Sequence, residues 1–423
     1  MNKIRLLHIA QCAGGVDCYL RMLLAHMDKK CFMQILICSP DYSEDKYQDL
    51  VEEFIQIEMC NSLSFVKDTK AIRKVRELIK HFRPDVIYCH SSKAGGIGRI
   101  ANMGIGIPII YNPHGWAFNM KGAKLKSFVY LWIERLLSSL TTRYITISNY
   151  EKLSAIQNHV TKANKVKVIF NGIDMEAVDK EVELSIVSRV SLNIPENAYL
   201  IGMVGRISRQ KAPDVFIHVA AALKNILPDA YFMIVGDGEQ RADIERLIRN
   251  EGLEGRIMIT GWVDNPIAYA CLFNQALLLS RWEGFGLVLA EYMKLEKPIV
   301  ATNVDAIPDL ITDYENGLLV EADNVDQAVE AVYKLYNDNI LREKVIKNGS
   351  MRVNAFFNVS RVANEHERLI VKLCEQGDKK ITFSLFVGMQ SPKKGGLRHE
   401  SSTFRKSEEW YRHICKKHSS IGR

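Results

Sequence analysis

The chain alternates short apolar runs with longer amphipathic segments over most of its 423 residues. Runs such as Ile4–Ala10 and Tyr199–Val204 are typical of buried strands, whereas Lys67–His81 repeats its apolar residues at helical spacing. Strands that alternate with helices predict an α/β fold, in which helices cover both faces of parallel, doubly wound sheets. The predicted strands are 4–10, 33–38, 86–89, 107–111, 144–148, 166–170, 199–204, 231–235, 256–260, 276–279, 299–301 and 318–320.

This alternation is interrupted once, which predicts two Rossmann-like domains. Residues 1–175 form the predicted N-terminal domain and residues 198–360 the C-terminal one. Residues 176–197 lose the pattern and are predicted to be a hinge or linker. Doubly wound sheets bind ligands at the carboxyl ends of their strands, so we expect a ligand in a cleft between the two domains.

The net charge of +7 comes entirely from the last segment of the chain. Residues 378–423 carry eleven Lys and Arg against four Asp and Glu, and the remainder is neutral. We predict a poorly ordered basic tail and no nucleic-acid partner for the body of the protein. The nine cysteines show no C-x-x-C pair, no apolar run is long enough to span a bilayer, and the start lacks a signal-peptide pattern. These features predict a cytoplasmic protein.

The segment from Ser280 to Glu291 combines a glycine turn with two carboxylates. A predicted strand precedes it, and an apolar helical segment begins at Leu287. The start of such a helix presents free backbone N–H groups and a positive dipole end to an anion. Glu283 lies in the turn and Glu291 in the helix, and carboxylates accept hydrogen bonds well from sugar hydroxyls. The pattern indicates a diphosphate ligand with hydroxyl-rich groups at both ends.

The stretch Glu283-Gly-Phe-Gly-Leu-Val-Leu-Ala-Glu291, followed by Lys-Pro-Ile-Val-Ala-Thr at 297–302, resembles the retaining family 4 glycosyltransferases. This resemblance implies the GT-B fold, with residues 361–377 as a helix that crosses back to an acceptor-side N-terminal domain. It implies that the N–H groups around Phe285, Gly286 and Leu287 bind the diphosphate of a nucleotide-sugar donor. Glu291 would accept from the ribose, and Glu283 would hold the donor sugar.

Other candidate residues follow predicted strands. Gly14 and Gly15 would let the backbone approach a ligand and leave helix N–H groups open. The resemblance implies that Gly15 lies near the donor phosphates, and Gly14 and Ser92 are candidate residues of the acceptor side of the cleft. The resemblance implies that His114 lies near the reacting centre, although a structural histidine packed against Trp116 is the alternative.

Two basic residues, Arg206 and Lys211, match an Arg and a Lys of the family, and together they suit a diphosphate. The family commonly has Gly where Ala212 follows this lysine. No Asp-x-Asp motif occurs, so we expect these cations to replace a metal, with no cofactor.

The bacterial capsular and exopolysaccharide enzymes of the family are the most similar around Gly14-Gly15-Val16-Asp17, which implies a polyprenyl-linked or other glycan acceptor. The segment 121–140 has the pattern of a basic amphipathic helix. It either lies on a membrane surface, at the inner face of the cell membrane, or packs in the core. Two further alternatives stay open: a nucleotide-sugar 2-epimerase of the same fold, and a non-catalytic nucleotide-sugar-binding protein.

Overall fold

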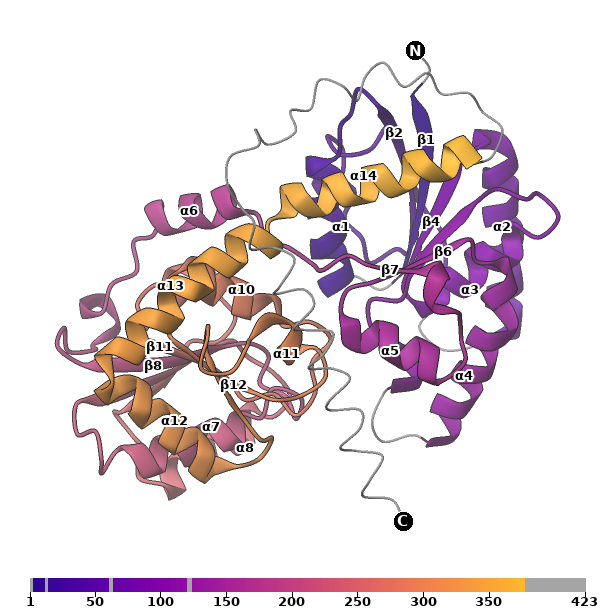
Figure 1. The fold of residues 1–423 in the computed structure, drawn as a ribbon. Helices are drawn as coiled ribbons and strands as arrows, with labels where there is room; N and C mark the ends of the chain where they lie inside the picture. The colour runs from indigo at the N-terminus through magenta and orange to yellow at the C-terminus, as the bar shows by residue number, and fades with distance from the viewer. Residues whose placement is uncertain (1–2, 12–13, 61–63, 120–123, 377–423) are drawn as a thin grey trace. The chain divides into compact units, whose positions relative to one another are not determined.

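The structure is a computed structural model, and it describes residues 3–11, 14–60, 64–119 and 124–376. These residues form two parallel sheets with helices on both faces (Figure 1). The predicted α/β class with doubly wound sheets is confirmed. The basic tail predicted for 378–423 lies outside the described residues.

The first sheet has seven strands in the order β3-β2-β1-β4-β5-β6-β7, and every pairing is parallel. Its strands are β1 (Ile4–Ala10), β2 (Phe32–Cys38), β3 (Glu53–Gln56), β4 (Val86–His90), β5 (Ile109–Asn112), β6 (Arg143–Thr146) and β7 (Val166–Val168). The helices that accompany it are α1 (Gly15–His26), α2 (Phe65–Phe82), α3 (Ser92–Ala101), α4 (Lys124–Leu137) and α5 (Asn149–Gln157). All the predicted strands of this half are present, and β3 is an additional one.

The second sheet has six parallel strands in the order β10-β9-β8-β11-β12-β13. Its strands are β8 (Tyr199–Val204), β9 (Ala230–Val235), β10 (Ile257–Ile259), β11 (Gln275–Leu278), β12 (Ile299–Thr302) and β13 (Leu318–Val320). Its helices are α7 (Pro213–Leu223), α8 (Arg241–Asn250), α9 (Pro266–Ala270), α10 (Leu287–Lys294), α11 (Ile307–Leu310), α12 (Val325–Asn337) and α13 (Asn339–Phe356). The segment predicted as a hinge contains most of α6 (Met175–Glu183), which packs against α9 and α10.

Both faces of each sheet are buried, which explains why the central strands are almost continuously apolar. In β1, Leu7 and Ile9 pack toward α2 and α3, while Ala10 on the opposite face packs with Leu20 and Leu24 of α1. In the second sheet the same alternation places Ile201 of β8 against α7 and Leu200 against the α9 side. A one-residue slip in register would exchange these faces, so the apolar pattern fixes the pairing.

The last described helix, α14 (Val359–Gln376), packs against α1 and contacts β4 (Figure 1). Its apolar side chains Val362, Ala363 and Ile370 are buried. A residue near the end of the described chain therefore reaches the first sheet, as His366 shows below.

Strand order reverses between β1 and β4 in the first sheet and between β8 and β11 in the second. At such a switch point the loops after the two central strands run in opposite directions and leave room at the carboxyl edge of the sheet. The candidate residues follow these same strands: Gly14 and Gly15 come after β1, Ser92 after β4, the 205–211 loop after β8 and the 280–286 loop after β11. The fold thus collects them at two sheet edges.

Candidate active site

Lys211 and Glu283 form an ion pair at the switch point of the second sheet. The Lys211 Nζ lies 2.5 Å from the Glu283 Oε2, and both side chains are largely buried. Ser280 Oγ donates to the same carboxylate oxygen over 3.2 Å. Burial keeps water from screening the pair, so the two charges hold each other firmly in place.

Hydrogen bonds from backbone and side-chain groups join the two loops that carry this pair. The Arg281 N–H donates to the Gln210 carbonyl over 2.8 Å, and Gln210 Nε2 donates to the Trp282 carbonyl over 3.1 Å. The Glu283 N–H donates to Asp305 Oδ2, just after β12, over 3.0 Å. Three loops therefore fix the position of Glu283.

Gly286 ends the turn and begins α10. Its φ of 80° lies in the left-handed region, and a Cβ there would meet the Glu283 Cγ and the Leu278 Cδ2 at 3.3 Å. No side chain caps the helix, so the N–H groups that begin at Leu287 remain free for an anion. The Phe285 side chain points into the core against Phe357, and a ligand can therefore reach only its backbone.

Glu291 lies on α10, half-buried beneath this helix start. Burial and, to a smaller extent, the neighbouring charge of Glu181 raise the pKa of its carboxyl group to about 7, while Lys211 opposes the rise. This raised pKa indicates that the free protein surrounds Glu291 with too little positive charge and too few hydrogen-bond donors to favour the carboxylate, until a ligand binds.

Arg206 is not in contact with Lys211. Its guanidinium is exposed and pairs with Glu239 over 3.1 Å, beyond the end of β9. The loops after β8 and β9 nevertheless pack closely, since a Cβ on Gly236 would lie 2.2 Å from the Gly205 carbonyl oxygen. Arg206 is therefore close to the glycine-containing loop 236–239.

Ala212 adopts the left-handed conformation that its glycine counterpart in the family would adopt easily. Its φ and ψ are 50° and 51°, it is fully buried, and it precedes Pro213 at the start of α7. The turn thus holds a side chain in a conformation that favours glycine, directly after Lys211.

The first sheet presents a second group of candidates. Gly14, with φ of 122°, precedes α1, and Gly15 is the first residue of that helix. No described atom would lie within 4 Å of a Cβ on either glycine, so the free protein has open space at both. Ser92 begins α3 and hydrogen bonds with Tyr111, which leaves it half-buried.

His114 follows β5 in a strained turn. Its φ is 50°, and its N–H donates to the Asn112 Oδ1 over 3.0 Å. The ring is half-buried and packs edge-on against Tyr19 of α1, with 4.5 Å between the ring centroids. Burial lowers the pKa of His114 to about 3, so the imidazole is neutral near pH 7. The alternative partner, Trp116, instead stacks on Phe118.

Sequence reasoning missed the residues behind His114. His90 Nδ1 lies 3.1 Å from His114 Nε2, and His8 Nδ1 lies 3.1 Å from His90 Nε2. The sequence did contain a signal for them, because His8 and His90 each lie within a largely apolar strand, β1 and β4. Within the described ranges, no group of three or more His, Cys, Asp or Glu could hold a metal ion.

Two family models together cover most of the described chain. Residues 13–177 match Glycosyltransferase Family 4, and residues 186–352 match Glycosyl transferases group 1. The chain belongs to the family 4 glycosyltransferases, and the predicted family is confirmed.

Its relatives include a UDP-Gal:alpha-D-GlcNAc-diphosphoundecaprenol alpha-1,3-galactosyltransferase of Escherichia coli, 30% identical over 75% of this chain and 83% of the relative. The capsular polysaccharide biosynthesis glycosyltransferase CapM of Staphylococcus aureus is 27% identical over 82% of this chain and 92% of its own length. The crystal structure of Anabaena HepE in complex with UDP superposes with a TM-score of 0.74 at 20% identity, covering 87% of this chain and all of that one. The GT-B fold follows.

Proposed function

We propose that this protein transfers a sugar, with retention of anomeric configuration, from a UDP-sugar to a hydroxyl of a polyprenyl-diphosphate-linked glycan in cell-surface polysaccharide synthesis. The observation that carries the proposal is the Lys211–Glu283 pair beside the uncapped start of α10. The pair offers a cation to a diphosphate and a carboxylate to the adjoining sugar within one fixed site.

The donor contacts follow from the charges. Lys211 and the N–H groups of Gly286 and Leu287 would hold the diphosphate, and Arg206 would swing from Glu239 to join them. Glu291 would accept from the ribose hydroxyls. The choice of UDP is supported by the name of the Escherichia coli relative and by the UDP complex of HepE.

In the reaction, the bond between the anomeric carbon and the phosphate oxygen breaks as the acceptor oxygen attacks the same face. The acceptor proton passes to the departing phosphate oxygen. Lys211 and the helix start stabilise the negative charge that grows on the leaving diphosphate, which removes the need for a metal. Glu283 offsets positive charge at the anomeric carbon, and His114 positions a sugar hydroxyl.

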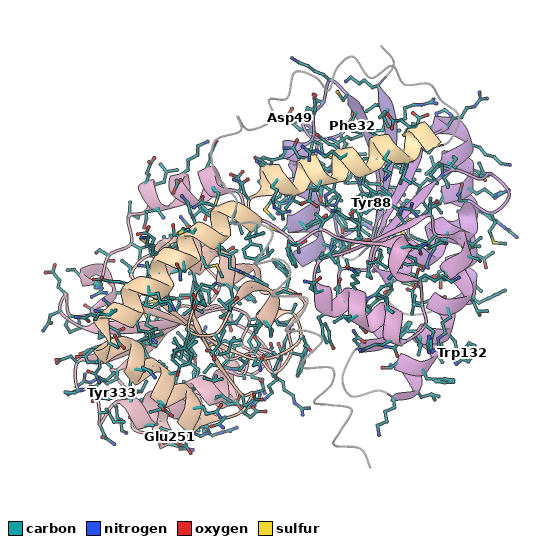
Figure 2. All side chains as sticks on the ribbon, viewed as in Figure 1. Phe32, Asp49, Tyr88, Trp132, Glu251 and Tyr333 are labelled. Carbon is teal, nitrogen blue, oxygen red and sulfur yellow. The ribbon has the colours of Figure 1, made fainter. Side chains whose placement is uncertain are left out.

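The lipid-linked acceptor is supported by α4, which exposes its apolar side chains and buries a charged one. Its one buried residue is a charged one, Glu134, while Leu125, Phe128, Val129, Trp132 and Leu136 are exposed. Figure 2 shows Trp132 standing out from the helix. An apolar face bordered by Lys124 and Lys126 suits an anionic membrane surface, where a polyprenyl acceptor resides. No described helix has both the length and the apolar character to cross a membrane, so this contact would be peripheral. Lys121, part of the predicted segment, lies outside the described residues.

The proposal is tested by supplying UDP-sugars with and without polyprenyl-diphosphate-linked acceptors and measuring UDP release. We expect release only with an acceptor, and a product whose anomeric configuration matches that of the donor. Release without an acceptor, together with an epimerised sugar, would instead support an epimerase.

The Glu283→Gln variant separates binding from chemistry. It should bind UDP within a few-fold of the unsubstituted protein and lose at least 100-fold in transfer, because only the transition state needs the negative charge. Glu330→Gln is the matched control, an exposed carboxylate on α12 that should change transfer little. Transfer by Glu283→Gln at the original rate would contradict the role of this residue.

A further inference from the structure

Three imidazole rings form a hydrogen-bonded chain that begins in the core of the first sheet and ends at His114. His8 Nδ1 is 3.1 Å from His90 Nε2, and His90 Nδ1 is 3.1 Å from His114 Nε2. The rings are nearly parallel, at 19° and 21° to one another. Both His8 and His90 are fully buried, so water does not compete for these bonds.

The sheet register produces this chain. His8 of β1 pairs with Tyr88 of β4, and two residues later Ala10 pairs with His90. Side chains two apart share a face, so His8 and His90 point to the same side, toward α1 and α14. His90 in turn pairs with Asn112 at the end of β5, which places His114 two residues beyond it. Two polar residues thus occupy core positions in strands where apolar residues would pack as well.

Each ring carries a single proton. Burial lowers the pKa of His8 to about 3 and that of His90 well below its usual value, as it does for His114. Two neutral rings share each hydrogen bond, so one nitrogen must donate and the other must accept. The three tautomers are therefore linked. Either both hydrogen bonds donate outward, toward His114, or both donate inward, toward His8.

The inner end of the chain selects the direction. His8 Nε2 is buried and has no hydrogen-bond partner among the described residues. If the protons pointed inward, this nitrogen would be a buried N–H donor without an acceptor, which is the rarer and costlier arrangement. If they point outward, it is a buried acceptor nitrogen without a donor, which is the less costly arrangement. His8 then donates to His90, and His90 donates to His114 Nε2.

We infer that His90, supported by His8, is a positioning residue that fixes His114 in the tautomer protonated on Nδ1, so that His114 acts as a neutral hydrogen-bond donor toward a hydroxyl oxygen of the donor sugar. His114 Nδ1 has no hydrogen-bond partner within the described part of the chain, and the ring is only half-buried. The inference rests on the proposed function for the identity of the ligand.

Neighbouring polar groups do not compete for this chain. His366 Nδ1 lies 2.7 Å from the Val362 carbonyl, to which it donates, and its Nε2 accepts from the hydroxyls of Tyr19 and Tyr88 at 2.9 and 3.0 Å. This second cluster closes on itself through α14. It packs beside the three histidines, with Tyr88 and His90 ring centroids 4.0 Å apart, yet among the described residues these three imidazoles hydrogen bond only to one another.

The test is nitrogen NMR of the full chain labelled with ¹⁵N-histidine. Couplings between ring nitrogens and carbon-bound protons distinguish the two tautomers, and the His114→Asn variant assigns the signal. We expect His114 to be protonated on Nδ1 in the ligand-free protein. Protonation on Nε2 would overturn the inference, whatever the protein transfers.

Variants of His90 supply the second measurement. His90→Leu removes the donor and should shift His114 toward the Nε2 tautomer, whereas the amide of His90→Asn can replace the Nδ1 donor and should restore the original tautomer. The value of one neutral hydrogen bond predicts that His90→Leu lowers kcat/KM for transfer about 2- to 10-fold, with UDP affinity unchanged and recovery in His90→Asn.

His366→Asn is the matched control, because it removes a neighbouring buried histidine without touching the chain. It should leave the His114 tautomer unchanged, and a shift as large as that of His90→Leu would overturn the inference. A correct tautomer in a protein that transfers no sugar would contradict the proposed function alone.

Discussion

Lys211 Nζ lies 2.5 Å from Glu283 Oε2, although 72 residues separate the two in the chain. Each residue follows a central strand of the second sheet, and the switch in strand order brings the two together. Glu283 is only 8% exposed, so in the free protein its side chain exchanges contacts with water for the ion pair with Lys211. Binding and stability are therefore coupled at this pair.

Replacing Lys211 by Met should weaken UDP binding about 10- to 100-fold, because a charge-assisted contact to the diphosphate is lost. It should also destabilise the free protein by about 2–3 kcal/mol, because Glu283 remains buried without its partner. Isothermal titration and urea unfolding measure the two effects.

The control for this prediction is Lys294→Met, which removes a more exposed pair with Asp179 and should cost under about 1 kcal/mol. Adding Glu283→Gln to Lys211→Met should recover most of the lost stability. If the double variant were as unstable as the sum of the single ones, the pair would not be coupled.

Glu291 predicts a pH dependence of stability. Its folded-state pKa of about 7 lies above the ordinary 4.5, so the folded protein holds this proton more tightly than the unfolded chain does. Stability from this group is present below pH 4.5 and is lost as the pH rises to about 7. Glu291→Gln should therefore be more stable than the unsubstituted protein at pH 8, by on the order of 1 kcal/mol, and equally stable at pH 4.5.

The same carboxyl group should make UDP binding pH-dependent. A carboxylate accepts from ribose hydroxyls better than a carboxylic acid, so affinity should rise through pH 7 and lose this rise in Glu291→Gln. Thermal melts at pH 4.5 and 8 measure the effect on stability, and titrations with UDP at pH 6 and 8 measure the effect on binding. Equal pH profiles for the two proteins would remove Glu291 from the ribose site.

Ala212→Gly should be nearly neutral, within about 1 kcal/mol, although it removes a buried methyl group. Relief of the left-handed conformation is worth about 1–2 kcal/mol, and it offsets the lost burial and the greater freedom of glycine in the unfolded chain. Ala220→Gly, at an equally buried position inside α7, gains no such relief and should cost about 1.5–2 kcal/mol. Urea unfolding of both variants checks the difference, and equal losses would contradict the strain at Ala212.

The exposed face of α4 should bind anionic vesicles. Trp132→Gln with Leu136→Gln should weaken co-sedimentation with phosphatidylglycerol vesicles at least tenfold, because both side chains lose apolar burial in the membrane interface. Neither change should affect folding, since the side chains are 47% and 72% exposed. Ile340→Gln, at an apolar residue of α13 that is 84% exposed, is the control. Unchanged sedimentation of the α4 variant would contradict membrane contact.

Local pattern was enough to predict most of the fold. The strands β1, β8 and β13 have the predicted bounds, because continuous apolar runs bounded by polar residues leave little freedom in where a buried strand ends. The exception is β3, an edge strand with no buried residue. Glu53–Gln56 resembles a polar loop, and only its pairing with β2 makes it a strand.

The parts of the site whose residues are close in sequence could be predicted. The parts whose residues are brought together by the pairing of distant strands could not. The turn from Glu283 to Leu287 is local, so its helix start could be anticipated. The contact between His8 and His90 depends on which strands are neighbours, which no local window contains. The direction of Arg206, toward Glu239, depends on the loop after another strand in the same way.

An amphipathic stripe likewise shows that one face of a helix is apolar, without showing which way that face turns. In α4 this orientation is set by Arg99. Its guanidinium donates to Glu134 over 2.9 Å and turns the polar side of the helix inward. Tyr111 donates to the other oxygen of the same carboxylate over 2.7 Å. A buried charge thus sets the orientation of the apolar face.

The hydroxyls of Tyr19 and Tyr88 hydrogen bond to His366, which follows them in the chain by 347 and 278 residues. During synthesis the first sheet can assemble early, but this polar cluster stays open until α14 has left the ribosome. A nascent chain halted before residue 366 would carry two phenols in its interior with one acceptor missing. Maturation of the first domain therefore waits for the synthesis of α14, long after its strands have been made.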